Sequence, residues 1–266
     1  GSAEGGVASD LSQMRLSAVL CLVTLVCVAQ CQSVYVSDDI SGKELRDQLK
    51  EEYYVDKHQS LDYEVARQYM YGYIDNHDGH VTGLYTGLDM PYPYGCEDTL
   101  YNTDIKCEHM IPQSFFGKHE PMRSDVHHLR PSYMMANSAR SNYPYDVIAD
   151  KDAYKWYQQR TVTTVSPPEA ERDDWSRVQK GYAWYPEAAA RGTVARGVLY
   201  LYTMYPKYIH GMHNVGDVSM FVDWCEEYPS TQMDMDRNDS AEQYQGNRNP
   251  YVDDNTLCRR AYADMI

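Results

Sequence analysis

The segment between residues 105 and 144 constrains the fold most, because the hydrophobic pattern changes several times within a short length. The apolar stretch Ile105–Met110 predicts a short strand that Pro112 ends. A second strand is predicted over Asp125–Leu129, and Pro131-Ser132 is typical of a helix start, in a helix that Pro144 must stop. The segment therefore predicts a strand, a loop, a strand and a helix in that order.

Helix signals dominate the rest of the chain. The capping-box pattern Ser41-Gly-Lys-Glu44 predicts a helix through Tyr53 or Tyr54. Ser60 is a candidate cap for a second helix, through about Tyr71. Four more helices are predicted. The first starts at Ser166 and ends before Gly181, and the others are Gly192–Tyr205, Val218–Glu227 and Met233–Gln245, the last ending at Gly246.

Strand signals are fewer. The turn pair Asp78-Gly79 precedes a predicted strand, Val81–Thr86, and Asp89–Thr103 is predicted as loop because it contains prolines and a glycine. Tyrosine is unusually frequent, with 26 residues against 3 phenylalanines, which favours a polar, loop-rich fold because a buried ring can keep its hydroxyl hydrogen-bonded. The fold class predicted is α+β, a mostly helical mixed domain.

The N-terminus has the pattern of a secretory signal peptide. Met14-Arg15 is a short positive start, and the apolar run Leu16–Ala29 is shorter than a membrane-spanning helix needs. We expect residues 1–13 to be an expression scar or upstream extension, 14–33 a signal peptide cleaved near its end, and 34–266 one domain. This predicts a secreted monomer, periplasmic if bacterial, with no stable membrane association; an uncleaved anchor is the alternative.

Four cysteines lie outside that segment: Cys96, Cys107, Cys225 and Cys258. An even number in a secreted chain predicts two disulfides. We favour the pairs Cys96–Cys107 and Cys225–Cys258, because each closes a local loop. A four-cysteine zinc site is the alternative, and it is disfavoured because no Cys-x-x-Cys spacing occurs.

The net charge of −15 by itself argues against a nucleic-acid partner, because phosphate binding usually leaves a basic footprint. The distribution of the charged residues along the chain, however, favours such a partner. Between Lys106 and Arg140, five basic residues stand against three acidic ones, and four histidines join them. A polyanion would be attracted only near this basic window; chance clustering is the alternative.

Three short stretches carry residues suited to phosphodiester hydrolysis: Cys107–Pro112, Ser124–Leu129 and Asn137–Asn142. The reaction needs a water deprotonated near neutral pH, and a neutral histidine can be the base. It also needs positive charge at the phosphate, which Mg²⁺ supplies while taking one or two oxygen ligands from the protein. Glu108 and Asn137 offer such oxygens. Arg140 is expected either to contact a phosphate or to anchor the helix.

Strand geometry limits how these residues can share a site, because neighbouring side chains on a strand point to opposite faces. Glu108 and His109 can share a site only if the strand ends or twists there. Pro112 makes this plausible because it removes a donor from the ladder. By the same alternation, at most one of His127 and His128 should face the site.

These stretches resemble the bacterial endonuclease I family, whose members are periplasmic or secreted nucleases with a ββα-metal (His-Me) finger. The matching stretches are Cys107–Ser114, Met122–Leu129 and Asn137–Pro144, followed outside the finger by Val194–Gly197 and Gly246–Val252. They occur in the family's order between roughly Leu61 and Cys258. The resemblance implies a domain built around such a finger.

The resemblance also implies site roles. His109 is expected as the general base, with Glu108 and Asn137 on Mg²⁺, or on Mn²⁺ or Ca²⁺ in its place. It implies non-specific cleavage of DNA, and often RNA, leaving a 5′-phosphate. Some members place an arginine on the leaving phosphate from a longer loop after the Glu-His pair, and Arg123 is the substitute predicted here, alongside Arg140.

Supporting roles are expected for Asp125, His127 and His128, with His127 more a hydrogen-bonded structural residue than a ligand. Other motifs are interpreted as structural. These are the turn Asp75–Gly79, the surface pair in His210-Gly-Met-His213, the glycosylation sequon Asn238-Asp-Ser240 at a surface position, and Gly246–Val252, held by side-chain-to-backbone hydrogen bonds.

Two rival functions remain at this point. One is a catalytically inactive secreted homologue that only binds nucleic acid or polyanions, which the negative charge favours. The other is an extracellular metalloprotease, which is disfavoured because the chain has no His-Glu-x-x-His motif. The complete set of Glu108, His109 and Asn137 favours the nuclease.

Overall fold

The computed structural model describes Gly1 and residues 36–266, and residues 36–266 make up one unit. The expected signal peptide and its cleavage point lie outside the described residues. Within the part of the chain that is described, no helix is both long and apolar enough to cross a bilayer.

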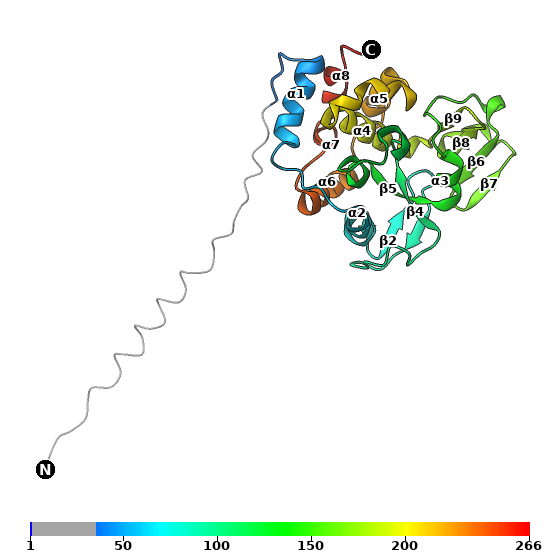
Figure 1. The fold of residues 1–266 in the computed structure, drawn as a ribbon. Helices are drawn as coiled ribbons and strands as arrows, with labels where there is room; N and C mark the ends of the chain where they lie inside the picture. Colours follow the sequence, from blue (N-terminus) through cyan, green and yellow to red (C-terminus); the bar gives the residue numbers. More distant parts are fainter. Residues whose placement is uncertain (2–35) are drawn as a thin grey trace. The chain divides into compact units, whose positions relative to one another are not determined.

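Helices are the most abundant regular structure in this unit (Figure 1). The α-helices are α1 (Gly42–Tyr53), α2 (Tyr63–Tyr69), α3 (Met134–Arg140), α4 (Ala188–Met204), α5 (Val218–Glu227), α6 (Gln232–Gln245), α7 (Pro250–Asp253) and α8 (Leu257–Ala261). A π-helical turn, η1 (Met70–Ile74), continues α2, and five 3₁₀ segments follow: η2 (Gln113–Phe116), η3 (Met122–Ser124), η4 (Asp150–Asp152), η5 (Glu169–Asp174) and η6 (Pro206–Asn214).

The strands form three small antiparallel sheets. The first has the order β1 (Asn76–His77), β2 (His80–Thr82), β3 (Asp89–Pro91). The second pairs β4 (Ile105–His109) with β5 (Leu129–Tyr133). The third has the order β7 (Thr161–Thr163), β6 (Lys155–Gln158), β8 (Ser176–Gln179), β9 (Ala183–Tyr185). The α+β class is thereby confirmed.

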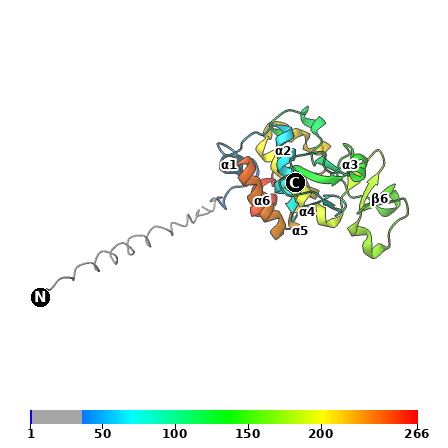
Figure 2. The same ribbon diagram turned by 90° about the horizontal axis from the view of Figure 1, so that it is seen from below.

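Helix α4 is the centre of the unit and lies between α1 and the four-stranded sheet in both views (Figure 1 and Figure 2). All its residues from Val194 to Met204 are buried, which is the pattern of a helix surrounded by other elements. Gly197 lets α4 approach the segment between β4 and β5 closely: a Cβ there would lie 2.0 Å from Cε of Met110 and 3.2 Å from the carbonyl oxygen of His127. The central helix therefore supports the predicted site from behind.

Four predicted helices are confirmed as α1, α4, α5 and α6, and α5 has the predicted bounds. The caps differ in detail. The Ser41 side chain makes no capping hydrogen bond, and α2 is capped by Asp62, not by Ser60. Helix α6 ends as predicted at Gly246, whose φ of +88° lies in the left-handed region that glycine adopts without strain.

The predicted strand Asp125–Leu129 and the helix start at Pro131 are wrong. Residues 125–128 form a turn in which Oδ1 of Asp125 accepts a hydrogen bond from the amide of His127 at 3.0 Å, so a side chain competes with strand pairing. Pro131 lies within β5 opposite Cys107. Proline is tolerated there because both strands of a two-stranded sheet are edge strands.

Other strand predictions also need correction. Strand β2 ends at Thr82 and residues 84–86 form a turn, while β3 lies inside the segment predicted as loop. The helix predicted from Ser166 is only the short η5, followed by β8. The four-stranded sheet was not predicted, because strands of three or four residues are too short to show a period of two.

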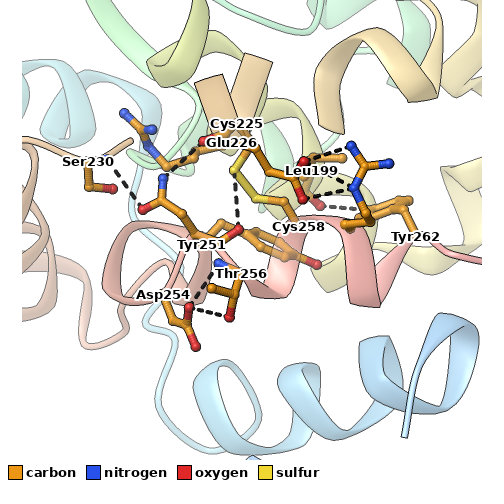
Figure 3. The surroundings of a disulfide bond; sticks show 12 residues. Leu199, Cys225, Glu226, Ser230, Tyr251, Asp254, Thr256, Cys258 and Tyr262 are labelled. Atoms are coloured by element: carbon orange, nitrogen blue, oxygen red, sulfur yellow. Dashed lines mark hydrogen bonds and ion pairs between the residues drawn. A yellow bond between two sulfur atoms is a disulfide. The ribbon is translucent and has the colours of Figure 1, made fainter. Parts of the chain in front are cut away.

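Helices α5 and α8 are joined by the predicted disulfide Cys225–Cys258, beside Tyr251 and Tyr262 (Figure 3). The predicted Cys96–Cys107 disulfide is wrong, because both residues are free thiols. A short loop does not by itself align two side chains, and β4 fixes the direction of Cys107, where burial raises the thiol pKa to about 12. Among the described residues no cluster of metal-binding side chains includes these cysteines, so the zinc alternative fails.

The sequon at Asn238 does not lie on the surface. Asn238 is 2% exposed, and its side-chain nitrogen donates to the carbonyl of Asn249 and to Asp253 at 3.1 and 3.0 Å. Its side-chain oxygen accepts from the amide of Asn249 at 2.8 Å. These bonds confirm the structural interpretation of Gly246–Val252 and leave no amide accessible for a glycan in the folded chain.

The basic window of the sequence does not become a basic surface. The side chains of Arg130 and Arg140 are 11% and 1% exposed, and burial lowers the pKa of Arg130 to about 9. Only Lys106 and Lys118 of the five basic residues are exposed. Clustering along the chain therefore says little about the surface charge here, since most of these cations point inward.

Candidate active site

The strands β4 and β5 and the helix α3 follow one another and pack together, with α3 against both strands. In the sheet, Glu108 lies opposite Arg130 and His109 opposite Leu129. The observed order of elements is the predicted strand, loop, strand and helix, although the second strand begins at Leu129 and not at Asp125. This arrangement places the end of β4 beside the helix that carries Asn137.

A cavity of about 410 Å³ lies at this junction. Its lining includes Glu108, His109, Asn137 and Arg140, all predicted from the sequence. Strand β4 ends at His109, so the alternation of side chains no longer separates this residue from Glu108. The sequence allowed Glu108 and His109 to share a site only if the strand ended or twisted there, and β4 does end at His109.

Glu108 is buried and held by two neighbours through the same oxygen. Oε1 accepts a hydrogen bond from the hydroxyl of Tyr85 at 2.7 Å and lies 3.4 Å from Nε of Arg140. Burial raises the pKa of Glu108 to about 7, while the charge of Arg140 acts in the opposite direction. Oε2 has no hydrogen-bond partner among the described residues, so this oxygen is available to another ligand.

Arg140 binds the framework of the site on several sides. Its Nη2 donates to the carbonyl of Met110 at 2.6 Å and its Nη1 to the carbonyl of Ser141 at 3.1 Å. The guanidinium carbon lies 4.8 Å from the centre of the Tyr145 ring. Of the two roles expected for Arg140, these contacts favour the anchor: the residue ties α3 to β4 and supports Glu108.

His109 has a defined tautomer. Its Nε2 lies 3.1 Å from the backbone carbonyl oxygen of Arg123, and because a carbonyl can only accept, Nε2 carries the proton. Nδ1 then holds a lone pair and has no hydrogen-bond partner among the described residues. Burial, followed by the nearby His128, lowers the pKa of His109 to about 3, so the imidazole stays neutral.

The guanidinium of Arg123 is directed elsewhere. It stacks on the ring of Tyr63 at 4.2 Å, and Arg123 is not among the residues that line the cavity. Tyr63 in turn lies against the His109 ring, with 5.5 Å between ring centres. Arg123 therefore reaches the site through its backbone carbonyl and, indirectly, through Tyr63.

Asp125 is fully buried behind the cavity in a hydrogen-bond network. Oδ2 accepts from the hydroxyls of Tyr200 at 3.0 Å and Tyr205 at 2.8 Å, and Oδ1 accepts from Nε2 of Gln245 at 3.0 Å. Asp125 thus ties the loop before β5 to α4 and α6.

The two histidines after Asp125 are also buried and lie outside the cavity lining. His127 donates from Nε2 to the carbonyl of Asn247 at 2.9 Å, and His128 donates from Nε2 to the carbonyl of Met122 at 2.6 Å. The His128 ring meets the His109 ring edge-on at 5.4 Å. Neither histidine faces the cavity, and because residues 125–128 form a turn, strand alternation does not set their directions.

The donors at this cavity fit a hard divalent cation. The carboxylate of Glu108 has one oxygen free of hydrogen bonds to the described residues. The side-chain nitrogen of Asn137 is buried and has no hydrogen-bond partner there, so it does not hold the amide group in one orientation. Magnesium keeps most of its waters and needs only one or two protein oxygens. Two neighbouring oxygen donors in one cavity therefore suffice.

Sequence reasoning missed the residues that position Glu108. Tyr85, in the turn after β2, donates to the carboxylate, and its hydroxyl lies 2.7 Å from that of Tyr145. The hydroxyl of Tyr145 donates to the carbonyl of Met110 at 3.0 Å. The excess of tyrosine over phenylalanine was the only signal for this role, and it does not identify positions.

Comparison with known proteins identifies the family to which the chain belongs. The chain matches the Endonuclease I family over residues 41–256. It is 27% identical over 166 residues to an extracellular ribonuclease of Bacillus subtilis (strain 168), and 28% identical over 166 residues to an extracellular ribonuclease of Bacillus amyloliquefaciens. Each match covers 56% of this chain and 51% of the relative, so the chain spans about half the length of these curated relatives. Because the family match includes β4, β5, α3 and every residue of the cavity, this chain belongs to the endonuclease I family.

Proposed function

We propose that the chain is a secreted, metal-dependent endonuclease that hydrolyses phosphodiester bonds of nucleic acid and leaves 5′-phosphate ends. The observation that carries the proposal is the cavity in which Glu108, His109 and Asn137 meet. Membership of the endonuclease I family supports the reaction class. DNA is the proposed substrate, with RNA as well, since the named relatives are ribonucleases.

In this proposal β4, β5 and α3 are the ββα-metal finger. Glu108, through Oε2, and Asn137, through its side-chain oxygen, would hold Mg²⁺, with Mn²⁺ or Ca²⁺ as substitutes. The bound cation supplies positive charge beside the scissile phosphate. Tyr85 and Arg140 hold the other oxygen of Glu108, so the carboxylate is oriented before any ligand arrives.

His109 is the proposed general base. The carbonyl of Arg123 holds the proton on Nε2, so Nδ1 can accept a proton from the attacking water. Because burial lowers its pKa to about 3, His109 is in the neutral form at any pH near 7. The proposed base and one of the two metal donors, Glu108, are adjacent residues of β4, so the backbone fixes their separation.

Secretion is part of the proposal and rests on two observations. The N-terminal sequence has the signal-peptide pattern, and both named relatives are extracellular. The rival is a secreted homologue that binds nucleic acid without cutting it. The rival predicts no metal-dependent cleavage, whereas the proposed base and donors predict cleavage that a chelator removes.

Nicking of supercoiled plasmid with Mg²⁺, with and without chelator, tests the proposal. We expect nicking that chelator abolishes and that His109→Ala lowers by about 10²- to 10⁴-fold. His80→Ala, at an exposed histidine of β2, is the matched control and should keep wild-type activity. Absence of cleavage by the wild type with any divalent cation would favour the binding-only rival.

A further inference from the structure

A second cavity, of about 490 Å³, lies beside the proposed catalytic cavity. Its lining includes five aromatic side chains and two asparagines, among them Phe115, Phe116, Tyr202, Tyr208, His213 and Asn142. The rings come from three elements, η2, the C-terminal end of α4, and η6. A cavity of this size and composition is suited to a flat aromatic ligand the size of a nucleoside.

The two cavities adjoin one another. Asn142 lines both, and η2 contributes Ser114 to the catalytic cavity and Phe115 to the aromatic one. For a ligand whose phosphate lies by Glu108, the adjoining cavity therefore offers Phe115 to the next group along its chain. The aromatic cavity would therefore receive the nucleotide next to the one whose phosphate lies by Glu108.

Three of the aromatic rings are available for stacking. Phe115 and Tyr208 are half-buried and His213 is exposed, and within residues 36–266 none of the three packs against another aromatic ring. Phe116, by contrast, is 3% exposed and already contacts the His128 ring. Tyr208 also has the ammonium of Lys207 4.9 Å from its ring centre, which places a positive charge beside the stacking surface.

A third cavity, of about 460 Å³, continues the path. Tyr208 lines both it and the aromatic cavity, and its lining includes Lys50, Lys207 and His119, with Glu120 as the acidic member. Neither lysine forms an ion pair within the described part of the chain, whereas Arg46, on the same helix as Lys50, is paired with Asp264. This end of the path therefore carries positive charge that is free to meet a phosphate.

We infer that the three cavities form a binding path for single-stranded nucleic acid, in which an unstacked base enters the aromatic cavity next to the scissile phosphate. This rests on the proposed function and adds the substrate class. Aromatic stacking combined with a few cations is the usual means of binding single strands without sequence preference. A duplex cannot use the aromatic cavity, because its bases stay stacked on one another.

The charge of the chain supports this route. A net charge of −15 and the inward orientation of the arginines near the site limit what phosphate contacts alone can contribute. Stacking depends little on ionic strength, so it can contribute affinity where long-range electrostatics opposes binding. The base, and not only the backbone, should then contribute to recognition.

Fluorescence anisotropy with His109→Ala protein, which we expect to bind without cutting, tests the inference. The probes are short single-stranded DNA and RNA oligonucleotides, the same DNA strand with abasic sites, and the matching DNA duplex. We expect both intact single strands to bind more tightly than the duplex and the abasic strand. Adding Tyr208→Ala should weaken single-strand binding by about 5- to 150-fold and leave duplex binding unchanged.

Two variants separate stacking from a loss of structure. Tyr208→Phe keeps the ring and should bind as the parent does. Tyr182→Ala removes a tyrosine that is 70% exposed and lines none of the three cavities, and it should also have no effect. Thermal unfolding of Tyr208→Ala should match the parent, because residues of η6 are largely at the surface.

The inference is overturned if the abasic strand binds as tightly as the intact one, if the duplex is preferred, or if Tyr208→Phe and Tyr208→Ala weaken binding equally. These outcomes leave the proposed function standing, provided the wild type still nicks plasmid with Mg²⁺. Failure to cut any substrate while binding still depends on the Tyr208 ring would instead remove the nuclease proposal and keep the binding path.

Discussion

The backbone carbonyl oxygen of Arg123 lies 3.1 Å from Nε2 of His109, while the Arg123 guanidinium stacks 4.2 Å from the centre of the Tyr63 ring. The contribution to the proposed base therefore comes from the main chain, which a side-chain substitution leaves in place. We expect Arg123→Ala to lower the plasmid-nicking rate by less than about tenfold. An arginine that stabilises the leaving phosphate would be worth about 10²- to 10³-fold, so a loss of that size would restore the phosphate-contact role.

Substitution of the metal donors and of the base should give different metal dependences. Glu108→Ala and Asn137→Ala should raise the Mg²⁺ concentration needed for half-maximal nicking, and excess Mg²⁺ should recover part of the activity because one ligand and the substrate phosphate remain. His109→Ala should bind metal and nucleic acid nearly as the wild type does and stay inactive at every Mg²⁺ concentration. If His109→Ala turns over normally while Glu108→Ala is inactive, the base lies elsewhere.

Tyr85→Phe tests the positioning of Glu108. The substitution removes the hydroxyl that donates to Oε1 at 2.7 Å and keeps the buried ring. We expect stability to fall by about 1 kcal/mol and the Mg²⁺ requirement to rise, with the maximal rate at saturating Mg²⁺ little changed. Metal titrations of the nicking rate separate these effects. A lower maximal rate with an unchanged Mg²⁺ requirement would contradict the positioning role.

The stability of the fold should fall in mild acid because His127 is buried in its neutral form. Burial lowers its pKa to about 4, against about 6.5 in an unfolded chain. The groups that face it are Asp125, which raises its pKa, Arg130 and Arg237, which lower it, and Tyr200, whose ring lies 4.6 Å away. Between about pH 6.5 and 4 the unfolded chain binds a proton that the folded chain does not, so stability decreases as the pH falls through this window.

Urea unfolding at several pH values measures this dependence. One such histidine corresponds to a loss on the order of 3 kcal/mol between about pH 7 and 4. His127→Gln keeps a side-chain NH₂ group that can donate to the carbonyl of Asn247 but does not titrate, so its unfolding free energy should depend less steeply on pH. Equal pH slopes for the two proteins would show that folding does not shift the pKa of His127.

The Cys225–Cys258 disulfide should contribute measurably to stability. It closes a loop with a sequence separation of 33, which in the chain-entropy model stabilises the fold by about 4 kcal/mol. Cys258→Ser should therefore lower the unfolding free energy by an amount of that order. Non-reducing peptide mapping should find these two cysteines linked, with Cys96 and Cys107 alkylated as thiols. A Cys96–Cys107 peptide would show that the loop does close.

The sequence predicted the site better than it predicted the elements that build it. Glu108, His109, Asn137 and Arg140 line one cavity, as their spacing and the family resemblance indicated. The strand expected at Asp125–Leu129 is instead a turn, because the Asp125 side chain binds the amide of His127. Local hydrogen bonding of this kind depends on side-chain geometry that a hydrophobic pattern does not record.

What the sequence determined by itself is the set of polar residues that line the cavity, the order of the elements around them, the helices with strong apolar spacing, and one of the two disulfide pairs. What only the tertiary structure decided is which way each polar side chain points. Arg140 could equally have faced a phosphate, and it faces Glu108 because α3 packs on β4. Tyr85 and Glu108 are brought into contact across the fold, with no spacing signal between them. Side-chain direction follows from packing against distant segments, and those contacts form only when the whole chain has folded.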